Sequence, residues 1–325
     1  MSHLLWTQKQ DVGPSARTSS AMAFDSTKNR TLLFGGTVGS TGALPMSDTW
    51  EWDGDNWTQV ADIGPLGRSD HGLAYDSARN RIVLFGGASS GGGGYLNDTW
   101  EWDGVEWTQI EDTGPAPRNG MGMCFDSKRG LTVMFGGGAG YTQFNDTWTW
   151  DGASWTQEDD GGPGARVYHR MDYDSARNRV VLFGGMSVTQ KQIQVQVRNT
   201  GLFSTGYHTE TQIVNSSQYF NDTWEYDGTT WTRVEDTGPA PRSSFGFAYS
   251  GSVMLLFGGR DGSNVFRDTW QYDGSNWTQR QDIGPAGRAP AGSAYDGLRK
   301  RFVIFGGSPG GSGAFGDTWE AFERP

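Results

Sequence analysis

The sequence is poor in cysteine and has no long hydrophobic run. Cys124 is the only cysteine in 325 residues, so no disulfide can form within the chain. No stretch reaches the roughly 20 apolar residues that a membrane-spanning helix needs. Apolar residues also never recur at the i, i+3, i+4, i+7 spacing of an amphipathic helix over three turns. These absences exclude a disulfide-stapled domain and a helical bundle.

Basic residues are outnumbered by acidic ones. The 26 Lys and Arg against 37 Asp and Glu leave a net charge of −11. This balance disfavours phosphate backbones and anionic lipids, so we expect no nucleic-acid partner and no membrane partner. Residues 1–6 lack the apolar core of a signal peptide, which predicts a soluble cytoplasmic protein, or a secreted one if a leader has been removed. No motif points to a cofactor.

Glycine and tryptophan are abundant instead, and both follow a repeat. The chain has 50 Gly, 12 Pro and 15 Trp. One unit contains a Gly-Pro-x-x-Arg that ends at Arg68, an apolar run into Phe85-Gly86-Gly87, and then Asp98-Thr99-Trp100. The same three motifs occur six times, so Gly and Pro mark turns rather than a low-complexity segment. The tryptophans of Asp-Thr-Trp are Trp50, Trp100, Trp148, Trp224, Trp270 and Trp319.

The repeat resembles that of the kelch family. Its period is about 50 residues, with Gly-Gly after an apolar run and a Trp further on, and it covers almost the whole chain. The chain is therefore identified as similar to bacterial-type kelch proteins. The resemblance implies an all-β fold, a six-bladed β-propeller of four-stranded antiparallel blades that forms a single domain over residues 1–325.

Each unit contains four short strand patterns, which we call strands a to d. In the second unit they are residues 72–76, 81–85, 99–102 and 107–110. The sixth unit supplies strands a, b and c, but it ends before strand d. The missing strand is present at the N-terminus as Trp6-Thr7-Gln8. We therefore expect the N-terminal strand to complete the last blade and close the ring.

One loop is much longer than its counterparts. The b–c and d–a loops share one side of the predicted ring, the d–a/b–c face, and the b–c loop of the fourth unit spans residues 186–221. It alternates polar and apolar residues from Gln190 to Val197, and Asn199-Thr200-Gly201 and a second β-prone run at 207–214 follow. The pattern predicts a β-hairpin inserted at residues 187–219, as a lid over this face or as a projecting arm.

An arginine follows Gly-Pro-x-x in every unit. A residue that all blades share is most simply structural, with its guanidinium bonded to loop carbonyls of the adjacent blade. In kelch proteins that bind partner peptides, however, arginines at this position reach the ligand. The resemblance therefore implies a ligand-binding role, and both hypotheses stay open. The arginines given this role are Arg17, Arg68, Arg118, Arg166 and Arg242.

The fourth unit departs twice from the others. Four places after its arginine it has Arg170, where the other units have Ala or Gly, and six places after it has Asp172, where they have Ala or Cys. Small residues are expected there because six innermost strands crowd the axis. Arg170 and Asp172 share one face of a strand, so the two can pair. A buried pair is costly unless it is fully hydrogen-bonded, and we therefore expect a functional role.

Two of the four histidines occupy equivalent places. His71 and His169 each lie three residues after the repeated arginine, and each follows a polar neighbour, Asp70 and Tyr168. We expect these residues and the two departures of the fourth unit to meet at the mouth of the central channel, where convergent polar groups form a ligand site. Two His and an Asp could bind a divalent cation. No metal-ligand spacing is visible, however, and we predict no metal.

The pattern supports three hypotheses for function. The first is a binding module that presents the d–a/b–c face and the channel mouth to a small polar or anionic ligand, or to a protein segment. The second is an enzyme similar to the six-bladed sugar epimerase of the kelch group or to propeller lyases. Its base would be His169 or Tyr168, with Arg170 stabilising negative charge and Asp172 as a further catalytic candidate. The third is self-association, in which the 187–219 hairpin adds a strand to another subunit.

Overall fold

The chain folds into strands alone over the part that the structure describes. The computed structural model describes residues 3–9, 12–39, 44–89, 94–111, 113–158, 161–198, 206–235, 237–281, 284–311 and 313–324. Every regular element in these ranges is a β-strand. Within the same ranges there is no helix of the length and apolarity that crossing a membrane requires. This agrees with the absence of helical periodicity in the sequence.

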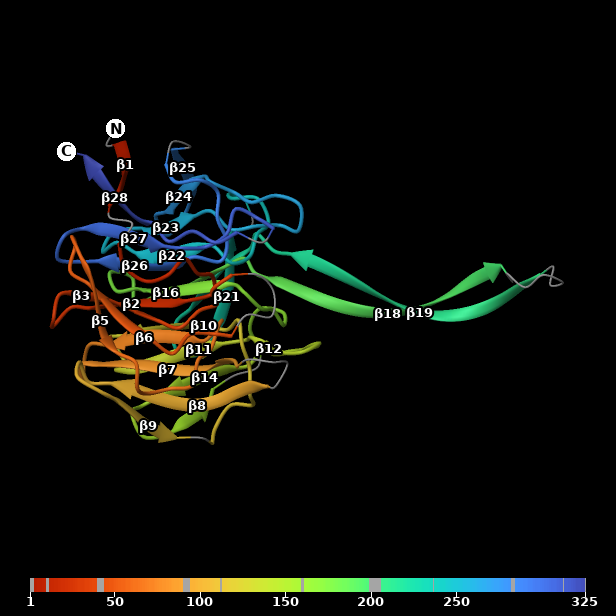
Figure 1. The fold of residues 1–325 in the computed structure, drawn as a ribbon, viewed down its shortest axis with the longest axis horizontal. Helices are drawn as coiled ribbons and strands as arrows, with labels where there is room; N and C mark the ends of the chain where they lie inside the picture. The colour runs from red at the N-terminus through yellow and green to blue at the C-terminus, as the bar shows by residue number, and fades with distance from the viewer. Residues whose placement is uncertain are drawn as a thin grey trace.

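The strands form six four-stranded antiparallel sheets around one axis, as predicted (Figure 1). Blade one contains β2 (Ala21–Asp25), β3 (Arg30–Phe34), β4 (Thr49–Trp52) and β5 (Trp57–Ala61). Blade two contains β6 (Gly72–Asp76), β7 (Arg81–Ala88), β8 (Tyr95–Trp102) and β9 (Trp107–Glu111). Blade three contains β10 (Gly122–Asp126), β11 (Leu131–Phe135), β14 (Thr147–Trp150) and β15 (Trp155–Gln157). Blade four contains β16 (Arg170–Asp174), β17 (Arg179–Phe183), β20 (Thr223–Tyr226) and β21 (Trp231–Glu235). Blade five contains β22 (Gly246–Tyr249), β23 (Met254–Phe257), β24 (Thr269–Tyr272) and β25 (Trp277–Gln281).

Blade six is completed by the N-terminal strand, which confirms the predicted closure. It contains β26 (Gly292–Asp296), β27 (Arg301–Phe305), β28 (Thr318–Arg324) and β1 (His3–Gln8). Strand β1 pairs antiparallel with β28, so the two ends of the chain lie side by side (Figure 1). Leu4 is 3% exposed in the core between blades five and six. Trp6 Nε1 donates to Thr269 Oγ1 of blade five at 3.0 Å.

The core lies between neighbouring blades. Strand b carries the apolar run of each unit, and Val83, Leu84 and Phe85 in it are fully buried. The tryptophan that begins strand d donates its Nε1–H to a threonine hydroxyl of the preceding blade, which satisfies the one polar atom of a buried ring. This bond recurs in all six blades, as Trp57–Thr318, Trp107–Thr49, Trp155–Thr99, Trp231–Thr147, Trp277–Thr223 and Trp6–Thr269.

The inserted hairpin is an arm and not a lid. It consists of β18 (Met186–Arg198) and β19 (Tyr207–Tyr219), which leave blade four between β17 and β20 and project away from the ring (Figure 1). The predicted turn at Asn199-Thr200-Gly201 lies outside the described residues. A small hairpin of blade three, β12 (Gly138–Ala139) with β13 (Thr142–Gln143), holds the base of the arm. The Gln143 amide donates to Val188 O at 2.7 Å and accepts from Val188 N at 3.1 Å.

We expect the burial of β1 to contribute to the stability of the whole ring. Leu4→Ala should lower the free energy of unfolding by about 2–4 kcal/mol, because it leaves a cavity in a packed core. Urea denaturation measures the change. Val12→Ala is the control, because that side chain is 79% exposed, and it should stay within about 0.5 kcal/mol of the wild type. An unchanged unfolding midpoint for Leu4→Ala would contradict closure of the ring by this strand.

Candidate functional site: the central channel

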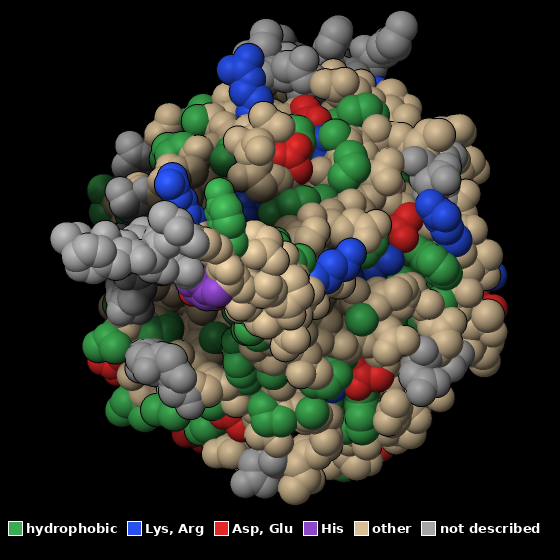
Figure 2. All heavy atoms as spheres, turned by 90° about the vertical axis from the view of Figure 1, so that its right-hand side faces the viewer, with side chains coloured by type: hydrophobic (Ala, Val, Ile, Leu, Met, Phe, Trp, Pro, Cys, Tyr) green, Lys and Arg blue, Asp and Glu red, His purple; other side chains and the backbone are tan. Residues whose placement is uncertain are grey.

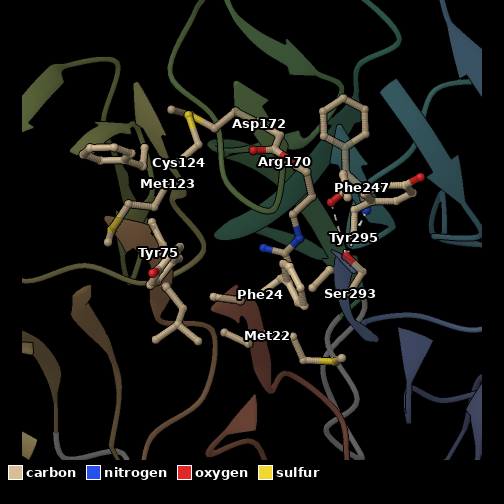
Figure 3. A pocket seen from close by; sticks show the side chains of 18 of the residues that line it. Met22, Phe24, Tyr75, Met123, Cys124, Arg170, Asp172, Phe247, Ser293 and Tyr295 are labelled. Atoms are coloured by element: carbon tan, nitrogen blue, oxygen red, sulfur yellow. Dashed lines mark hydrogen bonds between the residues drawn. The ribbon is translucent and has the colours of Figure 1, made fainter. Parts of the chain in front are cut away.

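A cavity of about 430 Å³ follows the axis of the ring. Its wall is formed by the innermost strands β2, β6, β10, β16, β22 and β26, which are neighbours around the ring. The wall is mixed, with apolar side chains such as Phe24 and Cys124 beside polar ones such as Ser293 and Tyr295 (Figure 3). A concave space of a few hundred Å³ that holds a few charged groups is typical of a small-molecule site.

Arg170 places a positive charge inside this cavity. It begins β16, and its guanidinium lies near the centre of the lining side chains (Figure 3). In the described part of the chain the side chain has neither a hydrogen bond nor an ion pair. Burial lowers the pKa of Arg170, while the negative charge of Asp70 acts in the opposite direction. The guanidinium stays charged at neutral pH because its ordinary pKa is above about 12.

Asp172 lines the same cavity, but no ion pair with Arg170 is found among the described residues, so the expected pairing is wrong. The Asp172 carboxylate accepts the backbone N–H of Tyr249 in blade five at 2.7 Å and that of Tyr173 at 2.8 Å. Burial raises the pKa of Asp172 to about 6, against the lowering effect of these two N–H groups. The carboxylate therefore links blades four and five and leaves Arg170 without a counterion.

Asp70 and Tyr168 lie at the channel mouth, where a circle of hydrogen bonds joins the blades. Both residues have a left-handed backbone, with φ of 54° and 58°. The backbone bonds, with the N–H donor first, run from Asp70 to Ser19, Gly120 to Asp70, Tyr168 to Gly120, Ser244 to Tyr168 and Ser19 to Pro290. The circle is open between Ser244 and Pro290 because proline has no N–H to donate.

The negative charge of Asp70 affects the protonation of Tyr168 at the channel mouth. Together with burial, it raises the pKa of the Tyr168 phenol. The phenol therefore stays protonated at neutral pH, where it can donate a hydrogen bond but is a poor base. Burial raises the pKa of Asp70 itself, while the charges of Arg170 and Arg260 lower it. The mouth thus carries a carboxyl and a phenol above the unpaired guanidinium.

Both histidines are buried in the interior of the ring. His169 is fully buried between blades three and four, where Nε2 accepts the Gly122 N–H at 3.1 Å and the ring packs edge-on against Phe135. It does not belong to the cavity wall, and burial lowers its pKa. His71 does line the cavity, but burial and the charge of Arg68 hold its pKa at about 3. The ligand or catalytic role of His169 stays a prediction that this geometry does not support.

The repeated arginines are buried in ion pairs. Arg68 reaches the two carboxylate oxygens of Asp98 at 2.6 and 2.8 Å, and its Nη1 donates to Gly86 O at 2.9 Å. Every blade repeats this pair, as Arg17–Asp48, Arg68–Asp98, Arg118–Asp146, Arg166–Asp222, Arg242–Asp268 and Arg288–Asp317. Each guanidinium thus bonds loops of its own blade rather than of the adjacent one. Ligand binding by these arginines stays a prediction, and at most 2% of any of them is exposed.

Sequence reasoning concentrated on charged residues and missed the aromatic part of the wall. Its signal is the seventh place after each repeated arginine, which is aromatic in all six units. The residues are Phe24, Tyr75, Phe125, Tyr173, Tyr249 and Tyr295, and all of them line the cavity. No group of three or more His, Cys, Asp or Glu that could hold a metal ion occurs in the described ranges.

The face around the channel mouth has no single dominant charge. Figure 2 looks onto the face from which the arm rises, and it shows Lys and Arg scattered among Asp and Glu. The face therefore offers no broad charged platform in this view, and the distinctive charge of the site lies inside the channel.

The first part of the chain matches a known family model. Residues 1–156 match the model described as the KLHDC2/KLHL20/DRC7 Kelch-repeats domain. This stretch covers β1 and blades one to three, and blades four to six repeat the same sequence words and the same strand order. No curated protein matches the chain.

A structural role of the repeated arginines predicts a loss of stability when one of them is removed. We expect Arg68→Met to lower the free energy of unfolding by about 3–5 kcal/mol, because Asp98 is left as a partly buried charge without its partner. Urea denaturation measures the change, and Arg267→Met at an exposed site should have no effect. A stable Arg68→Met variant would favour the ligand-binding hypothesis for these arginines.

The raised pKa of Asp172 predicts that this residue lowers the stability of the fold in a pH-dependent way. Its pKa is about 6 in the folded protein and 3.8 ordinarily, so the folded state holds a proton that the unfolded state has lost between these values. The contribution of Asp172 to stability therefore falls as pH rises from about 4 to 6, and the penalty is complete above that window. Between about pH 4.5 and 7.5, the free energy of unfolding of Asp172→Asn should rise by on the order of 1–2 kcal/mol relative to that of wild type. This energy is reduced from the full value of the pKa shift because Asp172 is partly exposed. Denaturation at both pH values tests this, and a parallel change in the two proteins would refute it.

Proposed function

Because the chain belongs to the kelch-repeat family, we propose that it is a binding propeller that takes a small anionic ligand into its central channel, with Arg170 as the anchor. The observation that carries this proposal is the unpaired guanidinium inside the central cavity. Arg170 is the only Lys or Arg among the described residues that line the cavity. The five other blades have Ala or Gly at the equivalent place.

An anion at this position would compensate a cost that the protein otherwise bears. Removing a charged group from water is unfavourable unless it is paired and hydrogen-bonded. A planar guanidinium presents two parallel N–H groups that match the two oxygens of a carboxylate or a phosphate.

The remaining wall favours a ligand with one negative charge and an apolar body. Ala74, Ala248 and Phe24 line the cavity together with Arg170 and offer apolar contacts. Asp172 is ionised above about pH 6, and its charge in the same cavity disfavours a second negative charge on the ligand. An aromatic or aliphatic monocarboxylate therefore fits better than a phosphate or a polycarboxylate.

The other hypotheses keep less support from this geometry. A protein segment on the d–a/b–c face stays a prediction, since the arginines expected to meet it are buried. The enzyme hypothesis also stays a prediction. The ring of His169 does not reach the cavity, and the phenol of Tyr168 has a raised pKa.

Titration calorimetry with phenylacetate tests the proposal, with phenylacetamide as the uncharged probe of the same shape. We expect wild type to bind phenylacetate and to bind the amide about 10- to 100-fold more weakly, the worth of charge-assisted hydrogen bonds. Arg170→Met should lose this preference, and Arg198→Met on the arm should retain it. Because Arg170→Met removes an unpaired, half-buried charge, its melting temperature without ligand should equal or exceed that of wild type.

Two results would overturn the proposal. The first is equal affinity of wild type for the acid and the amide. The second is a preference for the acid that survives in Arg170→Met, because the anion would then bind elsewhere on the protein.

A further inference from the structure

The arm formed by β18 and β19 lacks the packing that stabilises strands elsewhere in the ring. Most of its side chains are exposed, with Tyr207 at 68% and Ile213 at 62%. An isolated two-stranded hairpin is at best marginally stable in water, and three or more strands are usually needed. An arm of 13-residue strands therefore suggests that a further strand joins it.

The hydrogen bonds at the base reveal which backbone groups face outward. Met186 N and O bond to Val167, and Val188 N and O bond to the Gln143 side chain, so neither residue bonds to β19. In an antiparallel ladder this orientation recurs at every second residue. The outward positions of β18 beyond the base are Gln190, Gln192, Gln194, Gln196 and Arg198. Among the described residues, their outward N–H and C=O groups have no partner.

This edge lacks the features that normally prevent strand addition. Proteins protect free edges with proline, bulges, short strands or charges. Strand β18 has no proline, pairs with β19 in unbroken register over all 13 residues, and carries only Lys191 and Arg198 as charges. The Gln143 side chain already pairs with the edge at Val188 in the way that a neighbouring strand would.

The two faces of the arm differ. On one face Gln190, Gln194 and Gln196 donate across the hairpin to Asn215, Thr211 and Thr209 at 2.8–3.1 Å. The other face carries Ile193, Val195, Val197 and Val214. A strand added in the plane of the arm would extend both faces, and a second arm would place its own apolar row beside this one.

We propose that β18 pairs antiparallel with β18 of a second copy of this chain, so that two arms form one four-stranded sheet and the protein is a two-fold symmetric dimer. A two-fold axis at Gln194 places Gln192 opposite Gln196 and Gln190 opposite Arg198. The five outward residues of each copy then exchange up to about ten backbone hydrogen bonds.

Charge favours a second copy over an unrelated strand. In the register centred on Gln194, Lys191 lies opposite Val197 and Arg198 lies opposite Gln190, so like charges never meet. The described part of the arm holds Lys191, Arg198 and Glu210 as its fixed charges, whereas the whole chain carries −11. The arm is therefore a segment through which two acidic molecules can approach with little repulsion.

Two proline variants of the full chain test this pairing, and they are matched because Gln194 and Thr211 are opposite each other in the hairpin. Gln194→Pro removes an outward N–H from the β18 edge, Thr211→Pro removes one from the β19 edge, and each loses the same Gln194–Thr211 side-chain bond. Light scattering coupled to size exclusion gives the mass. We expect wild type and Thr211→Pro at twice the 35.5 kDa of one chain, and Gln194→Pro at 35.5 kDa.

A cross-linking experiment covers the case in which a proline disrupts the whole arm. Gln194→Cys should form an intermolecular disulfide under mild oxidation because the residue meets its own copy at the axis, and Thr211→Cys should not. Cys124 is buried and does not interfere. A monomeric wild type, a dimer that survives Gln194→Pro, or cross-linking at Thr211→Cys in place of Gln194→Cys would each overturn the proposal. None of these outcomes bears on Arg170 and the channel, whose ligand test is independent of the arm.

Discussion

One buried arginine per blade holds the propeller together. The guanidinium of Arg68 pairs with Asp98 in blade two, while its backbone carbonyl accepts the N–H of Gly36 in blade one at 2.9 Å. A side chain at Gly35 would clash with the same carbonyl, because a Cβ there would lie 2.6 Å from Arg68 O, and the backbone φ is +65°. Gly-Pro-x-x-Arg, Phe-Gly-Gly and Asp-Thr-Trp therefore belong to one joint. These three motifs recur in every unit because every blade uses the same joint.

The joint between blades five and six has fewer links than the others. Elsewhere a basic residue of the a–b turn reaches the c–d turn of the next blade, as Lys28 does when it donates to Gly104 O. Blade five has Ser250-Gly251-Ser252 at its a–b turn, and blade six has no c–d turn because its fourth strand is β1. The circle of mouth hydrogen bonds is open at the same junction, and a cavity of about 800 Å³ lies there beside Leu4. The Trp6–Thr269 bond and the packing of Leu4 are therefore a larger share of the contacts at this junction than their counterparts are elsewhere.

The fold was predictable because six copies of one pattern supply their own alignment. Blade number, the closing strand and the inserted hairpin all followed from counting repeats. The direction of Arg170 also followed, because alternate residues of an innermost strand face the axis. The partner of Asp172 did not follow, since the Tyr249 N–H belongs to another blade and its distance depends on how neighbouring strands are staggered. His71 and His169 occupy equivalent places, yet only the first lines the cavity, because local packing decides which ring reaches the axis.

Blade four shows where a symmetric ring can acquire a specific role. A change in the arginine joint would weaken two blades at once. Substitutions in the three repeated motifs would therefore destabilise the ring. The small residues facing the axis take no part in the joint, and the b–c loops join it only near their ends, as where Phe220 O accepts the Arg242 N–H at 3.0 Å. Blade four departs from the repeat at both places. The arm also begins close to the channel mouth, because Met186 at its base bonds to Val167, the neighbour of Tyr168. Pairing of two arms would therefore hold two channel mouths at a set distance, and one blade would determine both what is bound and how the binding sites are arranged.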